Sequence, residues 1–135
     1  MDESLLDSDI LSEILKSKNE RVVAAANDYV AQYARFTFSA ISSYEIVRGF
    51  KATGARRGLT KFKYLAEKSV VLPVTDDVLM RATDLWAVAV RGGHPRSDAD
   101  LIIAATALEA GLGLVTGNTA HFDWVPGLSV VNWRL

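Results

Sequence analysis

Four polar residues of this chain have the donors for metal-assisted hydrolysis, and each stands beside or shortly after an apolar segment. Asp7, Glu45 and Asp100 are acidic, and Asn118 carries an amide. In a parallel α/β domain, strand ends and the helix starts that follow them meet at one end of the sheet, so these residues should converge. Converging carboxylates repel one another unless a divalent cation offsets their charge. The pattern therefore predicts a metal-dependent hydrolase.

The neighbours of Asp7 offer further donors at the end of the first apolar segment. Ser8 adds a hydroxyl and Asp9 adds a second carboxylate. Either of them could instead cap a helix that begins at Ile10, because short polar side chains accept from the free amides of a helix start. For Asp9 we favour the cap. For Asp7 we favour the metal, because capping does not require two acids here.

Glu45 has a competing structural interpretation. The segment 42–45 reads Ser-Ser-Tyr-Glu, a capping-box pattern in which the glutamate reaches back to the first amide of a helix. Taken together with Asp7 and Asp100, the metal interpretation is favoured. Arg48 follows one helical turn later, so it is placed to orient Glu45 or to contact a substrate phosphate.

The remaining candidates lie near the third and fourth positions. Asp98 and Asp100 both stand where the macrodipole of a helix stabilises acids, but Asp100 opens a helix that must be buried, and Asp98 receives a supporting role. The side-chain carbonyl of Asn118 can ligate a metal or position a water, or Asn118 can cap the short turn that follows. His121 can serve as a ligand or proton shuttle, but we favour packing against Phe122.

The elements that must position these residues alternate between strands and helices. Strands are expected at 4–7, 37–40, 70–72, 114–116 and 129–131, and helices at 10–16, 21–34, 44–52, 59–68, 76–91 and 98–110. Strands separated by helices pair in parallel through right-handed crossovers. We therefore expect an α/β fold with about five short parallel strands flanked by helices. The helix at 98–110 is apolar nearly all round and should be the buried central helix.

Composition sets the wider limits. The 135 residues are expected to form one domain, residues 1–135, with half of the residues hydrophobic and 23% charged. The absence of cysteine excludes disulfides and thiolate metal sites. The first residues lack the pattern of a signal peptide, and no apolar run approaches the ~20 residues that span a bilayer. We therefore expect a cytoplasmic protein without a membrane segment.

The net charge of −1 argues against binding nucleic acid by global attraction. The basic residues are nevertheless concentrated in one stretch with few acids, at Arg48, Lys51, Arg56, Arg57, Lys61, Lys63 and Lys68. Such a stretch can hold RNA phosphates, or it can simply be a solvated helical face, and the sequence favours neither. As substrate-binding candidates we take Arg48, Lys51, Arg56 and Arg57.

Four segments in order resemble the PIN-domain ribonucleases, and most of all the VapC toxins of bacterial toxin–antitoxin pairs. They are residues 5–12, 39–49, 98–107 and 114–122. The resemblance runs from about residue 4 to Trp133. It departs from the family pattern in two places. The start of the chain, residues 1–4, is more polar than the usual first strand, and Asn118 stands where many members carry Asp.

The resemblance implies a three-layer PIN-like fold and an endoribonuclease that leaves 5′-phosphate and 3′-hydroxyl ends. From the residues we expect one or two Mg²⁺ or Mn²⁺ ions held by Asp7 and Asp100, with Glu45 and Asn118 completing the shell through water. Glu45 or Asp98 would then accept the proton of the attacking water.

The resemblance also implies a VapB-type antitoxin, whose arginine would pair with the acidic cleft and displace the metal. It further implies a homodimer, for which the apolar residues of the helices at 21–34 and 59–65 would supply the surface.

Two other functions remain open from the residues. Residues 5–9 also resemble the nucleophile motif of haloacid-dehalogenase-type phosphatases, with Asp7 as nucleophile and Asp9 as acid. That chemistry needs a lysine at a later strand end, and no lysine follows Lys68. The other alternative is a catalytically silent PIN-like binding module. Against it, Asp7, Glu45 and Asp100 are all retained although together they are costly.

Overall fold

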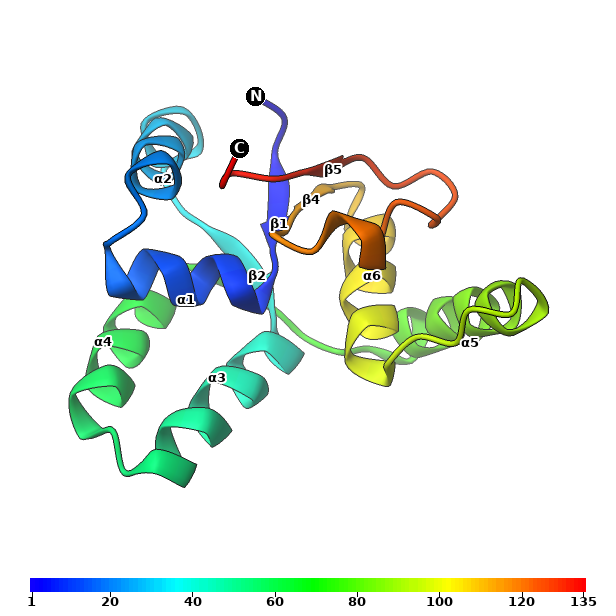
Figure 1. Cartoon of the computed structure of the whole chain (residues 1–135), viewed down its shortest axis with the longest axis horizontal. Coiled ribbons are helices and arrows are strands. Elements are labelled where there is room, and N and C mark those ends of the chain that lie inside the picture. The colour runs from blue at the N-terminus through cyan, green and yellow to red at the C-terminus, as the bar shows by residue number, and fades with distance from the viewer.

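The computed structural model describes all residues, 1–135, and contains one parallel sheet between two layers of helices (Figure 1). The strand order is β3-β2-β1-β4-β5. The strands are β1 (Ser4–Leu6), β2 (Thr37–Ser39), β3 (Val70–Leu72), β4 (Gly113–Val115) and β5 (Val130–Val131). The helices are α1 (Ser8–Lys16), α2 (Glu20–Tyr33), α3 (Ala40–Thr53), α4 (Arg56–Glu67), α5 (Asp76–Arg91), α6 (Asp98–Ala110) and the 3₁₀ helix η1 (Thr119–His121). The predicted fold class is confirmed.

The alternation of side chains along the strands divides the core into two clusters. Leu5 and Leu114 face the cluster with α5 and α6, whereas Leu6 and Val115 face the cluster with α1 to α4. These two strands pair in register, Leu5 with Leu114 and Leu6 with Val115. Helix α6 buries six of its residues, which confirms it as the central helix. The sheet is therefore covered on both faces, and its strand ends are left to form a site.

Helices α1 and α3 begin earlier than the sequence pattern predicts, because in each case the preceding strand runs directly into the helix. The N-cap of α1 is Asp7, whose side chain accepts from the Ser8 amide. The N-cap of α3 is Ser39, which accepts from the Ile41 amide at 3.2 Å. The capping-box interpretation of residues 42–45 is therefore wrong, since α3 is already formed at Ala40 and Glu45 lies inside it.

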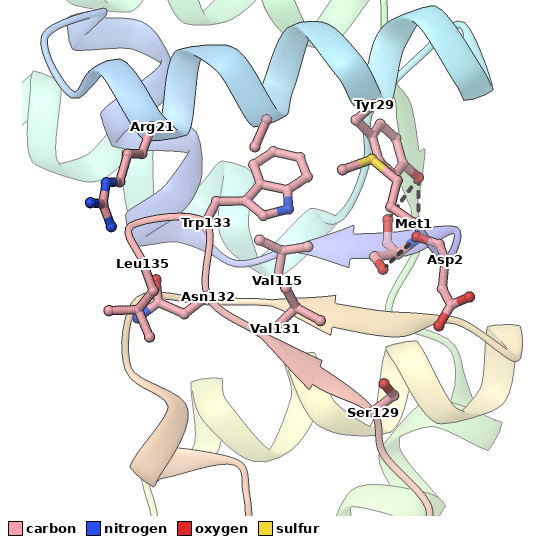
Figure 2. Close-up of a pocket in the computed structure, with 12 residues that line it drawn as sticks. Met1, Asp2, Arg21, Tyr29, Val115, Ser129, Val131, Asn132, Trp133 and Leu135 are labelled. Carbon is pink, nitrogen blue, oxygen red and sulfur yellow. Dashed lines mark hydrogen bonds between the residues drawn. The ribbon is translucent and has the colours of Figure 1, made fainter.

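The polar start of the chain is accommodated by a tyrosine of α2. The Tyr29 hydroxyl accepts from the Ser4 amide and donates to the Ser4 carbonyl, both at 3.1 Å. Figure 2 shows Tyr29 and Trp133 pointing into the space between α2 and the sheet. A cavity of about 440 Å³ lies there, lined also by Met1 and Leu135 near the two termini. None of the candidate catalytic residues lines this cavity.

The apolar residues that suggested a dimer surface on α2 and α4 are largely used in the core. Val22, Tyr29 and Phe62 are at most 3% exposed. Val30 of α2 and Tyr64 of α4 are exposed, and further exposed apolar residues lie on α5, as Leu79, Met80, Trp86, Val88 and Val90. The expected dimer surface on α2 and α4 stays a prediction. No helix of the protein is both long and apolar enough to pass through a bilayer.

Candidate active site

Asp7 occupies the centre of the carboxyl end of the sheet, where β1 passes into α1. It is 6% exposed. Its Oδ1 accepts from the Ser8 amide at 2.7 Å, and its Oδ2 accepts from the Thr116 hydroxyl at 2.8 Å. The first bond caps α1, and the second joins the end of β1 to the end of β4. Asp7 therefore caps α1 and is at the same time the candidate metal ligand, two roles that the sequence analysis weighed against each other.

The surroundings of Asp7 disfavour its charged form. Burial, together with the neighbouring Asp9 carboxylate, raises the pKa of Asp7 from 3.8 to about 7, and Asp100 acts in the same direction. The bonds from Thr116 and Ser8 lower the pKa, but they do not outweigh the burial. A buried carboxylate with acidic neighbours is the arrangement that a cation would relieve.

Asp9 bridges from α1 to the loop after β4 instead of capping the helix, because Asp7 already caps it. Its Oδ2 accepts from the Gly117 amide at 2.9 Å and from the Asn118 side-chain amide at 3.3 Å. Its Oδ1 is buried and has no hydrogen-bond partner. The favoured interpretation of Asp9 as a cap is therefore wrong. Asn118 likewise makes no side-chain cap for η1 and joins Asp9 instead.

A close approach at Gly117 holds this loop against the C-terminal residues. A Cβ at Gly117 would lie 2.6 Å from Asp9 Oδ2 and would also collide with the Arg134 guanidinium. Arg134 reaches Asp9 and Glu13, with nitrogen–oxygen distances of 3.7 Å to each carboxylate. The C-terminal segment thereby supplies a cation behind the acidic cluster.

Glu45 contacts the residue that follows Asp7. Its Oε1 accepts from the Ser8 hydroxyl at 2.8 Å, across 37 residues of sequence. The expected partnership between Glu45 and Arg48 does not form, because the Arg48 guanidinium lies over the Tyr44 ring, 5.0 Å from its centroid. Ser8 therefore connects the first and second acidic positions.

Asp100 pairs with a histidine that the sequence analysis assigned to packing. His121 Nδ1 lies 3.2 Å from Asp100 Oδ2, whereas the ring of Phe122 lies 6.4 Å away between centroids. His121 therefore lies beside Phe122, as expected, and also beside the Asp100 carboxylate. Asp98 is not brought to this cluster, because it lines a separate cleft between α5 and α6.

The basic stretch covers α3 and α4. All seven of its cations, Arg48, Lys51, Arg56, Arg57, Lys61, Lys63 and Lys68, are exposed, and none forms an ion pair. Lys68 lies over the Tyr64 ring, 4.9 Å from its centroid. Positive charge that is not neutralised within the chain is available to a polyanion.

The donor set fits a hard divalent cation in its chemistry. Oxygen donors from Asp7, Glu45 and Asp100 come from three different elements, and the buried Oδ1 of Asp9 lacks a partner. No group of three acidic or histidine side chains is arranged in this structure so that it could hold a metal ion. Water would therefore have to complete the coordination, as is usual for Mg²⁺.

Three residues of the site gave no chemical signal in the sequence. The Thr116 hydroxyl donates to Asp7 and accepts from the backbone amide of Asn118 at 3.0 Å, so Thr116 links these two residues. Gly117 permits the close approach, and Arg134 pairs with Asp9. The position of Thr116 at the end of an apolar strand was the only available indication.

Comparison with known proteins gives the family. The PIN-domain pattern matches residues 4–127. VapC ribonuclease Y4jK of Sinorhizobium fredii is 33% identical over an alignment 136 residues long, and the alignment covers 95% of each chain. The tRNA(fMet)-specific endonuclease VapC of Salmonella typhimurium is 25% identical over 130 residues, 96% of each chain. The chain therefore belongs to the PIN-domain family and, within it, to the VapC ribonucleases.

A solved structure agrees with this assignment. The DNA-bound VapBC complex from Salmonella typhimurium contains a chain that superimposes with a TM-score of 0.85 at 25% identity. The match covers 98% of this chain and 99% of that one. Nearly the whole of this fold is thus shared with a chain of a VapBC complex.

Proposed function

We propose that this chain is an endoribonuclease that acts as the toxin of a toxin–antitoxin pair and hydrolyses RNA phosphodiester bonds. Membership of the VapC ribonucleases supports the activity. The observation that carries the proposal is the buried Asp7 carboxyl, with a pKa of about 7, set among Asp9 and Asp100 at the end of the sheet. Acidic groups held together against their own repulsion are typical of a catalytic site.

The side chains then have separate roles. Asp7 and Asp100 would hold Mg²⁺ or Mn²⁺, with Glu45 and Asn118 completing the shell through water. When bound, the ion would lower the pKa of a water and offset charge on the phosphate. Glu45 Oε2 has no hydrogen-bond partner within the protein, so it can accept the proton of the attacking water. Asp9 holds Asn118 in place through its side-chain amide.

The cations of α3 and α4 would hold the RNA backbone. Arg48, Lys51, Arg56 and Arg57 are exposed and unpaired on these two helices. Phosphate contacts of this kind supply affinity without reading sequence, and they weaken as salt increases. In this proposal the basic residues of α3 and α4 attract the RNA, and the acidic residues at the end of the sheet carry out the hydrolysis.

A VapB-type antitoxin is the proposed partner. The similar structures include VapBC complexes from Salmonella typhimurium and Haemophilus influenzae. An arginine of the partner is well suited to pair with Asp7, Glu45 and Asp100, because its fork of donors matches carboxylates and its charge replaces that of the metal. The proposal accounts for how a cell tolerates the nuclease.

The homodimer stays a prediction, with two active sites along a shared groove. A two-fold contact would have to use exposed apolar side chains, and these include Val30 of α2, Tyr64 of α4 and several residues of α5. Light scattering at micromolar concentration tests the assembly. A clean monomer of 14.7 kDa would contradict it.

The direct test is cleavage of RNA by the purified protein with Mg²⁺ or Mn²⁺ and with a chelator. Metal should be required, and Mn²⁺ should raise the melting temperature by binding only the folded state. Asp100→Asn should keep the fold and lose both effects. A phosphoaspartate trapped on Asp7 would instead favour the phosphatase, and no cleavage with any metal would favour the silent binding module.

A test in cells addresses the toxin role. Expression of the chain alone should arrest growth, Asp7→Ala should not, and co-expression with a neighbouring antitoxin gene should restore growth. An Asp7→Ala chain as toxic as the parent would show that toxicity does not come from this site.

A further inference from the structure

The two oxygens of the Asp9 carboxylate are in different situations. Oδ2 accepts from the Gly117 amide at 2.9 Å and from the Asn118 side-chain amide at 3.3 Å. Oδ1 is buried and has no hydrogen-bond partner. Buried polar atoms of native proteins nearly always have a partner, so an exception calls for a role such as contact with an ion or an ordered water. One oxygen therefore fixes the side chain, and the other is left for a group that the chain does not supply.

Gly117 allows the loop after β4 to hold Oδ2. A Cβ at position 117 would lie 2.6 Å from Asp9 Oδ2, so a larger residue would push the carboxylate and the loop apart. Carboxylates that ligate metals are usually held by hydrogen bonds from surrounding groups, which fix their orientation. The Asp9 carboxylate is held in this way before any ligand binds.

Asp9 also lies among the other acidic residues of the site. It lines a cleft between α1 and α3 together with Ser8 and Glu45, and the Ser8 hydroxyl donates to Glu45 at 2.8 Å. After burial, the Asp9 charge makes the largest contribution that raises the pKa of Asp7, and this contribution exceeds that of Asp100. Like charges gathered at one place repel one another, and a divalent cation offsets the repulsion. Asp9 therefore belongs to the same group of charges as the other three acids.

The nearest cation of the chain compensates Asp9 only in part. The Arg134 guanidinium lies 3.7 Å from Asp9 Oδ2, the oxygen that already has two donors, and its side chain is 35% exposed. The same guanidinium is shared with Glu13, also at 3.7 Å. Long ion pairs that are open to solvent contribute little. Negative charge at Asp9 thus remains available to a second cation.

We propose that Asp9 supplies the fourth negative charge of the cation site, beside the three other acids. Asn118, the fourth position of the sequence pattern, is neutral and donates to Asp9, so this charge lies on α1 and not in the loop after β4. The inference rests on the proposed function for the presence of a metal. In addition to holding Asn118, Asp9 then contributes to the affinity for the ion.

The experiment measures Mn²⁺ binding by titration calorimetry without RNA, so that the result does not depend on cleavage. Asp9→Asn removes the charge but keeps the size of the side chain and an oxygen that can accept from Gly117. It should weaken Mn²⁺ binding roughly tenfold or more, as is typical for residues that support a metal site. Adding Asn118→Asp should restore most of the lost affinity, because it places the carboxylate on the other side of the same 3.3 Å contact. Melting of the metal-free variants checks that they are folded.

The matched control is Glu13→Gln. Glu13 lies one helical turn after Asp9 on α1, contacts the same Arg134 at the same distance of 3.7 Å, and is equally exposed, at 20%. This variant should bind Mn²⁺ like the parent. Unchanged Mn²⁺ affinity in Asp9→Asn, or an equal loss in Glu13→Gln, would overturn the inference. A loss that Asn118→Asp does not reverse would overturn it too, because Asp9 would then only hold the loop in place.

The same measurements separate this inference from the proposed function. A parent that binds Mn²⁺ through Asp9 but does not cleave RNA would refute only the nuclease. A parent that cleaves RNA, with a Mn²⁺ affinity that Asp9→Asn leaves unchanged, would refute only the fourth charge.

Discussion

The two ends of β1 both bury polar groups, but only the groups at the amino end are in surroundings that favour them. At the amino end, the Ser4 amide and carbonyl are both satisfied by the Tyr29 hydroxyl, at 3.1 Å each. At the carboxyl end, Asp7 has two hydrogen bonds, yet burial and the neighbouring Asp9 carboxylate raise its pKa to about 7. Only two residues lie between Ser4 and Asp7, and both Ser4 and Asp7 are at most 6% exposed.

The difference shows which end is arranged for stability and which for chemistry. Buried polar groups that find all their partners stabilise the fold and need no ligand. Buried acids that repel one another reduce stability until a cation or a proton compensates them. The carboxyl end of β1 is therefore the place where stability and function oppose each other, and the amino end is not.

The largest expected effect is on activity at the carboxyl end. Asp7→Asn should reduce RNA cleavage at least roughly 100-fold, because even residues that only support metal ligands typically contribute about 10- to 100-fold. The fold should persist, since an asparagine at position 7 can accept from the Ser8 amide and donate to Thr116. Cleavage rates with saturating metal measure the effect. Activity near that of the parent would remove Asp7 from the site.

The same carboxyl group predicts how stability depends on pH in the metal-free protein. In the folded protein, the pKa of Asp7 is raised from 3.8 to about 7. The stability that its protonated form contributes is therefore fully present below pH 3.8 and is lost as pH rises through 7. The loss is on the order of 4 kcal/mol for an isolated buried group. Urea unfolding with chelator should show that the free energy of unfolding decreases more between pH 5 and pH 8 in the parent than in Asp7→Asn. Equal decreases in the two proteins would contradict the raised pKa of Asp7.

The amino end should respond in stability alone. Tyr29→Phe removes the hydroxyl and leaves the Ser4 amide and carbonyl buried without that partner, which should destabilise the protein by about 1–3 kcal/mol. RNA cleavage below the melting temperature should stay at the parent level. Denaturant unfolding together with a cleavage assay measures both quantities. A large loss of activity in the still-folded variant would break the distinction between the two ends.

The smallest effect should come from the cation behind the acidic cluster. Arg134 lies 3.7 Å from Asp9 and from Glu13 and is 35% exposed, so Arg134→Gln should change stability by less than about 1 kcal/mol. Cleavage should fall far less than in Asp7→Asn. An equal loss of cleavage in the two variants would show that Arg134 is part of the catalytic site.

The sequence alone determined the order of elements, the central position of α6 and the acidic end of the sheet. These features follow from local patterns, because apolar periodicity and strand–helix alternation leave few topologies open. Asp7, Glu45 and Asp100 were predicted as site residues because acids beside apolar segments are conspicuous, and their catalytic role stays a prediction. The substrate-binding role of Arg48, Lys51, Arg56 and Arg57 stays a prediction.

Only the tertiary structure decided which partner each polar side chain takes. Asp9 was expected to cap α1, but it accepts from Gly117 more than a hundred residues later, at a sequence separation of 108. His121 lies next to Phe122 as expected, but its contact with Asp100 was not predicted. The Asp9–Gly117 contact joins segments that follow β1 and β4, two strands that are adjacent in the sheet and distant in the chain. Its geometry depends on the register and on the close approach at Gly117, and neither leaves a periodic signal in the sequence.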